Sequence, residues 1–320
     1  MQAINHDVRK EVFVLPDLVA IGHVLMDIRI FVDEFPVADG EAKTDKLSLG
    51  GGGSAANVAV GASRLGVKSG FIGSIGFDTF GRVLLEELEH DGVDVTHVKV
   101  DTATSSGLTV IAINMKGQVM MFGYAGASDK LFPSDLDKDY ISTSEHVHIT
   151  GLSFDTALAA AKIAKKANVT VSFDPGRLMS RIGLKSLLPL LRYVDQILLN
   201  QEEAQELTGL IELEKVAKTL LSSGPKIVIV KRGPNGVFAM DHSKSFSVPA
   251  YPVKVVDTTG AGDAFSAGFI TAQLEGKSLE DSVEFANATA NLKITRVGAR
   301  ALPNRKAVER FLKEYKESKL

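Results

Sequence analysis

The stretch Val255-Val256-Asp257-Thr258-Thr259-Gly260-Ala261-Gly262-Asp263-Ala264-Phe265 decides how this chain is interpreted. Two β-branched residues lead into a run of small residues, and an apolar period typical of a helix follows, with Phe265, Phe269 and Leu274 on one face. The pattern predicts a glycine-rich turn that opens a helix. The first turn of a helix has N–H groups without partners inside the helix, and the helix dipole adds positive potential there. The stretch therefore predicts an anion-binding turn.

Asp263 lies in the first turn of this predicted helix, where its charge would repel a bound phosphate. One chemical task suits a carboxylate at such a place, which is to accept the proton of a hydroxyl group that attacks the terminal phosphorus atom. A structural interpretation competes, because Asp is favoured in the first turn of any helix. The stretch alone leaves both interpretations open, and the rest of the chain decides between them.

Composition narrows the class of protein. The chain has 320 residues, of which 45% are hydrophobic, so it can bury a large core. A net charge of −3 argues against nucleic acid or an anionic membrane as the main partner. The absence of Cys excludes disulfides, thiolate metal sites and cysteine nucleophiles, and fits a reducing compartment. The N-terminus lacks a signal-peptide pattern, and no apolar run is long enough to span a bilayer, so we expect a cytoplasmic protein.

Periodicity predicts an α/β protein. Predicted strands lie at residues 18–22, 28–32, 43–49, 68–75, 95–100, 107–115, 118–124, 146–150, 169–173, 196–199 and 227–231, with further β-structure at 236–249. Predicted helices lie at 54–65, 77–90, 155–167, 186–193, 201–208, 211–222, 261–275, 279–295 and 304–317. Strands that alternate with helices imply a mostly parallel sheet. The segments at about 26–49 and 95–124 contain strands only, and we expect them to form a small antiparallel lid sheet on a single domain spanning 1–320.

Three motifs occur in order along the chain: Gly50-Gly51-Gly52-Gly53-Ser54-Ala55-Ala56-Asn57, Asn200-Gln201-Glu202-Glu203, and Asp257 to Asp263. On these motifs the chain resembles the PfkB (ribokinase-like) carbohydrate and nucleoside kinases, from Asp17 to about Phe311. The resemblance implies a three-layer αβα fold with a β-sheet lid. It also implies an ATP-dependent kinase that transfers the γ-phosphoryl group to a hydroxyl of a small sugar or a ribonucleoside.

The resemblance assigns roles to single residues. Asp263 would be the catalytic base, and Gly260, Ala261 and Gly262 would form the anion hole. The substrate would contact Asp27, Gly52, Gly53, Asn57 and Arg177. The nucleotide would lie near Asn200, Lys231, Gly233, Thr258 and Asn287. Asn200 and Glu203 would organise Mg²⁺ through water, and Asp257 and Thr259 would help to bind a monovalent cation, usually K⁺, with carbonyl groups of the loop at about 296–301.

Basic residues bear on the acceptor. Phosphosugar kinases of this family usually have a Lys inside the glycine-rich run, and the run at 50–53 contains none. This favours an unphosphorylated sugar or a nucleoside. Arg29, Lys43, Lys46 and Arg177 keep a phosphosugar kinase, acting on a sugar 1-phosphate or a sugar 6-phosphate, as the alternative.

Two further classes of protein compete with a kinase. A dinucleotide-dependent oxidoreductase needs Gly-x-Gly-x-x-Gly directly after a strand, and the contiguous glycines match that spacing only loosely. A non-catalytic sugar-binding relative is disfavoured by the intact Asp263. Because a small sheet with one apolar face needs cover, the lid also predicts a homodimer.

Overall fold

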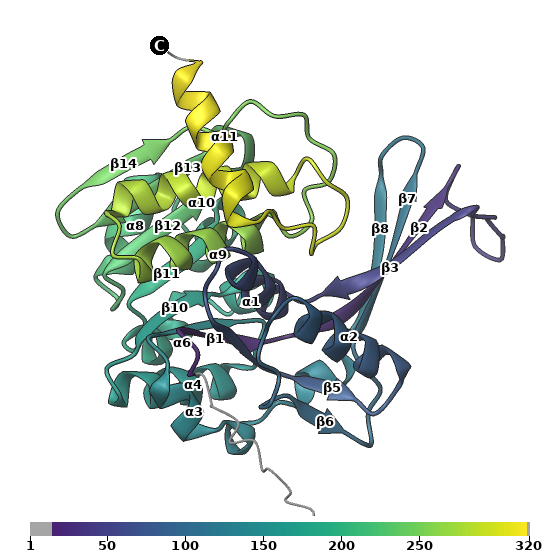
Figure 1. Cartoon of the computed structure of the whole chain (residues 1–320), viewed down its shortest axis with the longest axis horizontal. Coiled ribbons are helices and arrows are strands. Elements are labelled where there is room, and N and C mark those ends of the chain that lie inside the picture. The colour runs from purple at the N-terminus through teal and green to yellow at the C-terminus, as the bar shows by residue number, and fades with distance from the viewer. Residues whose placement is uncertain (1–14, 319–320) are drawn as a thin grey trace, which may run out of the picture.

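An eight-stranded sheet forms the centre of the computed structural model, which describes residues 15–318 (Figure 1). Its strand order is β14-β13-β12-β11-β10-β9-β1-β4, and all neighbours from β12 to β4 run parallel. β13 and β14 join as an antiparallel edge. The strands are β1 (Leu18–Gly22), β4 (Ser69–Ile72), β9 (His146–Thr150), β10 (Thr170–Asp174), β11 (Gln196–Asn200), β12 (Ile227–Lys231), β13 (Val237–Asp241) and β14 (Ser245–Val248).

Helices cover both faces of this sheet, as the three-layer prediction requires. The helices are α1 (Ser54–Arg64), α2 (Thr79–His90), α3 (Lys138–Thr143), α4 (Phe154–Lys166), α5 (Gly176–Ser180), α6 (Leu184–Leu191), α7 (Gln201–Thr208), α8 (Leu213–Leu221), α9 (Ala261–Leu274), α10 (Leu279–Lys293) and α11 (Arg305–Glu317). Ile197 and Leu199 of β11 pack with α4, α6, α7 and α8, whereas Leu198 packs with α9 and α10. This alternation is what a strand buried on both faces requires.

Helix α9 is the most deeply buried helix near the predicted site. Its residues from Ala264 to Ala272 are all buried, and it packs between α1 and α10. The close approach to α1 depends on Gly61, because a Cβ there would lie 2.6 Å from the Cβ of Ala267. The start of α9, which carries Asp263, is therefore held in place by neighbours on two sides.

A second, four-stranded sheet projects from the main body (Figure 1). It contains β2 (Leu25–Val32), β3 (Lys46–Gly52), β7 (Leu108–Asn114) and β8 (Val119–Tyr124) in the order β3-β2-β7-β8. The predicted lid strands at about 26–49 and 107–124 are confirmed as neighbours in this sheet.

The lid differs from the prediction in two respects. β2 and β7 pair in parallel, so the sheet is not wholly antiparallel. The reason is connectivity, because the chain returns to the main body between these strands, and parallel neighbours need such a crossover. The segment predicted as a strand at 95–100 forms only β6 (Lys99–Asp101), which pairs with β5 (Ser74–Gly76) in a separate two-stranded sheet. The β-sheet insertion therefore begins at about residue 108 rather than 95.

Within residues 15–318, no helix combines the length and the apolar character needed to cross a bilayer.

Candidate active site

A cavity of about 770 Å³ opens beyond the carboxyl ends of three central strands. Asp174, Asn200 and Lys231 end β10, β11 and β12, and all three line it. Ligands of parallel α/β sheets bind at this edge. The lining also includes Ser54, Glu203, Gly233, Thr258, Ala261, Gly262, Asp263 and Asn287. The fold thus brings most of the predicted nucleotide and catalytic residues to one place.

The turn before α9 has the geometry of an anion cradle. Gly260 precedes the helix with φ of 76°, and a Cβ there would lie 2.7 Å from the carbonyl oxygen of Ala299. The N–H of Ala261 donates to the Thr258 carbonyl at 3.1 Å. Among the described residues, no protein acceptor is found for the N–H groups of Gly262 and Asp263. The N–H of Gly260 likewise has no protein acceptor among these residues, so of the three predicted donors only that of Ala261 is engaged, in closing the turn.

The carboxylate of Asp263 lies at the floor of this cavity. Asn57 Nδ2, from the start of α1, donates a hydrogen bond of 2.7 Å to Asp263 Oδ2. Burial, with a further contribution from the negative charge of Asp174, raises the pKa of Asp263 to about 6 even though Asn57, Lys231 and Ser54 act in the opposite direction. At neutral pH the group is therefore ionised, and it is a stronger base than an exposed carboxylate.

Lys231 supplies positive charge beside the cradle. Its Nζ lies 2.7 Å from Asp174 Oδ2 and 3.3 Å from the point that a Cβ of Gly262 would occupy. Burial alone would lower the pKa of Lys231, but the carboxylates of Asp174 and Glu203 outweigh it and raise that pKa. A charged ammonium group is therefore fixed where phosphate oxygens would approach the N–H groups of α9.

Asn200 and Glu203 form a reciprocal cap at the start of α7. Glu203 N–H donates to Asn200 Oδ1 at 2.9 Å, and Asn200 N–H donates to Glu203 Oε2 at 2.8 Å. Burial and the charge of Asp174 raise the pKa of Glu203. Within residues 15–318 no three acidic or His side chains converge as metal ligands. Two carboxylate and amide oxygens facing a phosphate site fit Mg²⁺ held mainly by phosphates and water.

Asn287 has a structural task at the cavity wall. Its Nδ2 donates to the Pro249 carbonyl at 2.7 Å, and its Oδ1 accepts from Asn291 at 3.0 Å. Gly233 lies opposite, in the short 3₁₀ turn Gly233–Asn235. Both residues line the cavity, and the amide of Asn287 is engaged in holding its wall, while their contact with a nucleotide stays a prediction.

Most of the residues predicted to contact the acceptor lie in the lid sheet and directly beside it, and they define the acceptor end of the site. Asp27 is buried in β2, and a Cβ on Gly52 of the neighbouring strand would lie 2.7 Å from its carboxylate. Arg29 Nη2 lies 3.0 Å from Asp27 Oδ2. Burial raises the pKa of Asp27, although Arg29 and Arg300 act in the opposite direction. Gly53, which precedes α1, connects this end to Asn57 and through it to Asp263.

Arg177 does not reach this group of residues. Its side chain is exposed on α5, and it lines neither the nucleotide cavity nor the cavity next to the lid. Its positive charge acts to lower the pKa of Glu203, which lines the nucleotide cavity. The structure therefore places Arg177 nearer to the nucleotide side than to Asp27 and Asn57, and its contact with the substrate stays a prediction.

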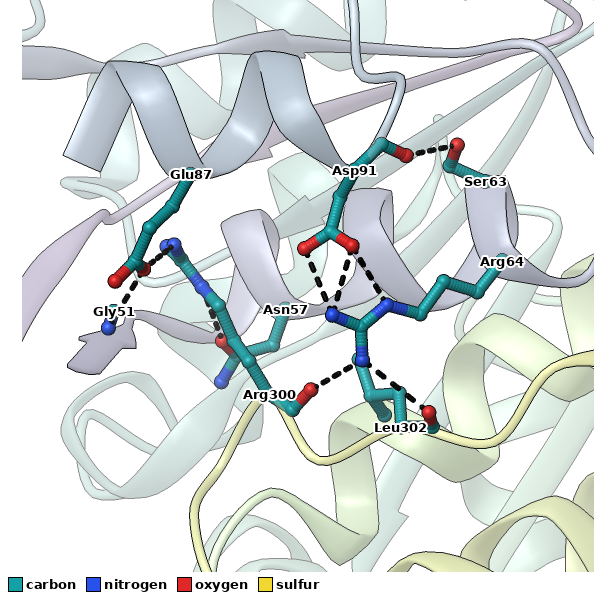
Figure 2. Close-up of polar contacts among 8 residues, drawn as sticks. All are labelled: Gly51, Asn57, Ser63, Arg64, Glu87, Asp91, Arg300 and Leu302. Carbon is teal, nitrogen blue, oxygen red and sulfur yellow. Dashed lines mark hydrogen bonds and ion pairs between the residues drawn. The ribbon is translucent and has the colours of Figure 1, made fainter. Parts of the chain in front are cut away.

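Arg300 is a site residue that the sequence did not indicate (Figure 2). It is 9% exposed, and its Nη1 lies 2.8 Å from Glu87 Oε2. Its Nη2 donates to the Gly52 carbonyl at 3.1 Å, and its Nε donates to Asn57 Oδ1 at 3.3 Å. The guanidinium group thus lies against the glycine-rich run and the residue that binds Asp263. The only available signal was a single arginine among small and apolar residues at 297–302.

A second arginine fixes the loop that carries Arg300 (Figure 2). Arg64 on α1 forms two hydrogen bonds to Asp91, the residue directly after α2, at 2.8 and 3.0 Å. Its Nη1 also donates to the carbonyl oxygens of Arg300 and Leu302, at 2.6 and 3.3 Å. A cavity of about 560 Å³ next to the lid is lined by Arg29, Gly51, Arg64, Glu87 and Arg300, among others. Three arginines therefore border this cavity.

Comparisons with known proteins agree with this geometry. The model of the pfkB family of carbohydrate kinases matches residues 15–307. The chain belongs to this family. This PfkB-family chain is 38% identical over 297 residues to the ATP-dependent ribose-1-phosphate kinase of Halopiger xanaduensis, covering 93% of this chain and 98% of the relative. It is 31% identical over 322 residues to the 5-dehydro-2-deoxygluconokinase of Clostridium beijerinckii, covering 94% of each.

A solved structure gives the same result. The Arabidopsis thaliana ribokinase, complexed with ribose and ATP, matches with a TM-score of 0.86 and 30% identity, covering 94% of this chain and 99% of the ribokinase. The predicted ribokinase-like fold and PfkB membership are confirmed. The protein is a sugar kinase, a phosphotransferase that acts on an alcohol group. The oxidoreductase alternative is excluded, and the glycine-rich run forms the end of a lid strand, β3, rather than following a central parallel strand.

The raised pKa of Asp263 predicts how Asp263→Asn changes stability. The folded state holds the proton at a pKa of about 6, against about 3.9 in an unfolded chain. Stability therefore falls as pH rises from about 4 to 6, and the loss persists above that range. An Asn at position 263 has no charge to bury, so this loss of stability disappears, and its amide oxygen can still accept the hydrogen bond from Asn57. We expect the Tm of the variant to exceed that of the unmodified protein by about 2 °C at pH 7.5 and the difference to shrink towards pH 4.

The control is Glu89→Gln, which changes an exposed carboxylate on α2. It should leave Tm almost unchanged at both pH values. If the Tm of Asp263→Asn lies below that of the unmodified protein by the same amount at pH 7.5 and at pH 4.5, the buried, proton-binding environment assigned to Asp263 is contradicted.

Proposed function

We propose that this kinase transfers the γ-phosphoryl group of ATP to a hydroxyl of a small sugar that carries an anionic group. The acceptor that we favour is a sugar phosphate. The observation that carries this proposal is the position of Asp263, hydrogen-bonded to Asn57 at 2.7 Å while lying in the first turn of α9. A hydroxyl bound at the acceptor end and a phosphoryl group on the N–H groups of α9 would meet at this carboxylate.

The proposed reaction is an in-line displacement. The acceptor oxygen forms a bond to the γ-phosphorus, the bond to the β–γ bridging oxygen breaks, and ADP leaves with that electron pair. The hydroxyl proton passes to Asp263. A sugar hydroxyl is about as weak an acid as water, with a pKa of about 16, so the carboxylate accepts the proton late, once bond formation has made the oxygen acidic. Alignment and electrostatic stabilisation supply most of the rate.

The other groups of the cavity have matching tasks. The N–H groups of Gly262 and Asp263, with Lys231, would bind the phosphoryl oxygens on which negative charge develops. Asn200 and Glu203 would hold the water shell of Mg²⁺, which when bound neutralises charge on the β- and γ-phosphates. The resemblance also implied K⁺ near Asp257 and Thr259. The ammonium group of Lys293 lies beside Asp257. A cytoplasmic location and the absence of nucleic-acid and membrane partners stay predictions.

Two buried arginines favour an anionic acceptor over a neutral sugar or nucleoside. Arg29 and Arg300 flank Asp27, which binds sugar hydroxyls in this proposal, and both lower its pKa. Buried guanidinium groups are typical binding partners of phosphate and carboxylate. Two relatives point the same way, since one is named for ribose 1-phosphate and the other for a sugar acid. The glycine-rich run lacks a Lys, but Arg300 places a cation against that run from the opposite end of the chain.

Asp263→Asn tests the proposed base. We expect kcat with Mg-ATP to fall by about 10²- to 10⁴-fold, while the affinity for ATP changes little, because Asn keeps the size of the side chain. The kcat/KM of the unmodified enzyme should decline below a pH of about 6, where Asp263 becomes protonated. ADP release measures both, across pentoses, hexoses, their phosphates and nucleosides. A variant with near-normal kcat would place the base elsewhere.

Arg300→Met tests the acceptor class. Loss of a hydrogen-bonded charge predicts a drop of about 10- to 100-fold in kcat/KM for a sugar phosphate such as ribose 1-phosphate. The kcat/KM for the free sugar should change much less, so the ratio of the two values is the readout. Arg310→Met is the matched control, because that arginine is exposed on α11 and lines neither cavity. Equal losses for both acceptors in Arg300→Met would rule out recognition of the anionic group.

We also propose that the lid pairs with the lid of a second copy. Every residue of β8 is exposed, including Val119, Met121 and Phe122, and Leu47 and Leu49 are exposed on β3. An open apolar strand edge of this kind needs cover in water. Sedimentation at micromolar concentration should show a dimer that Met121→Lys dissociates. A monomer at all concentrations would exclude this arrangement.

A further inference from the structure

A lysine is completely buried beside the turn that leads to the catalytic residues. Lys293 is the last residue of α10 and is 0% exposed. Its Nζ donates a hydrogen bond of 2.9 Å to the carbonyl oxygen of Asp257. Lysines are almost never fully buried without a partner for their charge. The ammonium group therefore has a defined task at this place.

The surroundings of the ammonium group belong to the region where the resemblance implies a monovalent cation. Asp257 accepts hydrogen bonds from Gly298 N–H at 2.8 Å and from Thr259 N–H at 2.9 Å, one on each carboxylate oxygen. These bonds outweigh burial and keep the pKa of Asp257 below its usual value. The N–H groups of Val256 and Asp257 both donate to the carbonyl of Ile294. These hydrogen bonds connect the end of α10, the turn at 257–259 and the loop at 298 to one another.

The residues present do not fit K⁺ at this place. Proteins hold K⁺ in a cage of oxygen atoms, mostly carbonyls. Here the carbonyl of Asp257 already accepts from Lys293, and both oxygens of the Asp257 carboxylate already accept from backbone N–H groups. A second cation against the same carbonyl would be repelled by the buried ammonium group.

We infer that Lys293 takes the place of a monovalent cation, so that phosphoryl transfer by this kinase does not need K⁺. This inference rests on the proposed function. Lys293 is a positioning residue that fixes the turn at 257–259, from which the chain passes directly to Gly260 and the N–H groups of α9. Its charge also lies near enough to Asp263 for the two to interact.

Two carboxylates and the end of a helix lie close to Lys293. Burial, with the charge of Arg29, lowers the pKa of Lys293 from its usual value, and the carboxylates of Asp257 and Asp263 act in the opposite direction. The C-terminal end of α10 carries the negative end of the helix dipole, which favours a cation at this position. A tethered cation also spares the protein the need to capture one from solution.

The unmodified enzyme gives the first test. Its kcat with Mg-ATP should agree within about twofold in K⁺, Na⁺ and tetramethylammonium salts at equal ionic strength, and its Tm should not depend on which of these is present. Activation by K⁺ of fivefold or more would overturn the inference. If no acceptor is phosphorylated under any condition, the proposed function fails, and the dependence of Tm on the cation still tests the role of Lys293.

Variants at Lys293 give the second test. Lys293→Met keeps the length of the side chain without its charge, and kcat should fall by about 10- to 100-fold, as expected for one charge-assisted hydrogen bond. Lys293→Ala leaves room for an ion, so K⁺, NH₄⁺ or methylammonium should restore part of the activity and raise the Tm of this variant alone. Lys306→Met, which changes an exposed lysine of α11, is the control.

A readout independent of activity is thallium(I), which replaces K⁺ and is located in crystals by its anomalous scattering. The unmodified protein should show no thallium beside Asp257, and Lys293→Ala should show it there. Thallium beside Asp257 in the unmodified protein would overturn the inference. If Lys293→Ala does not fold, Lys293→Met and the measurements on the unmodified protein decide the question. A Lys293→Met variant with full kcat would limit Lys293 to a structural role.

Discussion

The hydrogen bond from Asn57 to Asp263 joins the starts of two helices through residues that lie 206 positions apart in the chain, and the site depends on it. α1 and α9 pack side by side, and each begins after a glycine with positive φ, Gly53 or Gly260. Neither helix start has a side-chain cap, which is also true of α5, α6 and α8. The starts of α1 and α9 differ from those three because the hydrogen bond from Asn57 to Asp263 brings them together, so that their dipoles favour an anion at the same place.

Buried charges surround that point in a fixed order. Lys231 and Asp174 lie on the nucleotide side, Arg300 and Arg29 on the acceptor side, and Lys293 beneath the turn. Each cation has a carboxylate or carbonyl partner, so the site keeps its shape before any ligand binds. Such pre-formed partners cost little reorganisation when phosphate charge develops, which is how a rigid polar site accelerates phosphoryl transfer. Asp263 differs from the rest, because its burial leaves it basic enough to accept a proton.

Local pattern was sufficient to predict the central sheet, its helices and the anion-binding turn before Asp263, whereas the roles of Asn200 and Lys231 came from the resemblance to the family. Gly260, Asp263, Asn200 and Lys231 lie at strand ends or helix starts, and those boundaries are visible in the sequence. Arg300 and Lys293 could not be found this way. The partners of Arg300 lie more than 200 positions earlier in the chain, and they are Glu87, Gly52 and Asn57. The partner of Lys293, Asp257, lies 36 positions earlier, before α9. The parallel pairing of β2 with β7 was missed for a similar reason, since strand periodicity does not reveal which strands become neighbours.

The most direct measurement is a crystal structure with ribose 1-phosphate, Mg²⁺ and a non-hydrolysable ATP analogue bound together. A base at residue 263 requires one acceptor hydroxyl about 2.6–3.2 Å from its carboxylate, the terminal phosphoryl group on the first N–H groups of α9, and the sugar phosphate against Arg300. An acceptor whose hydroxyls all point away from Asp263, or a triphosphate bound away from the start of α9, would contradict this arrangement.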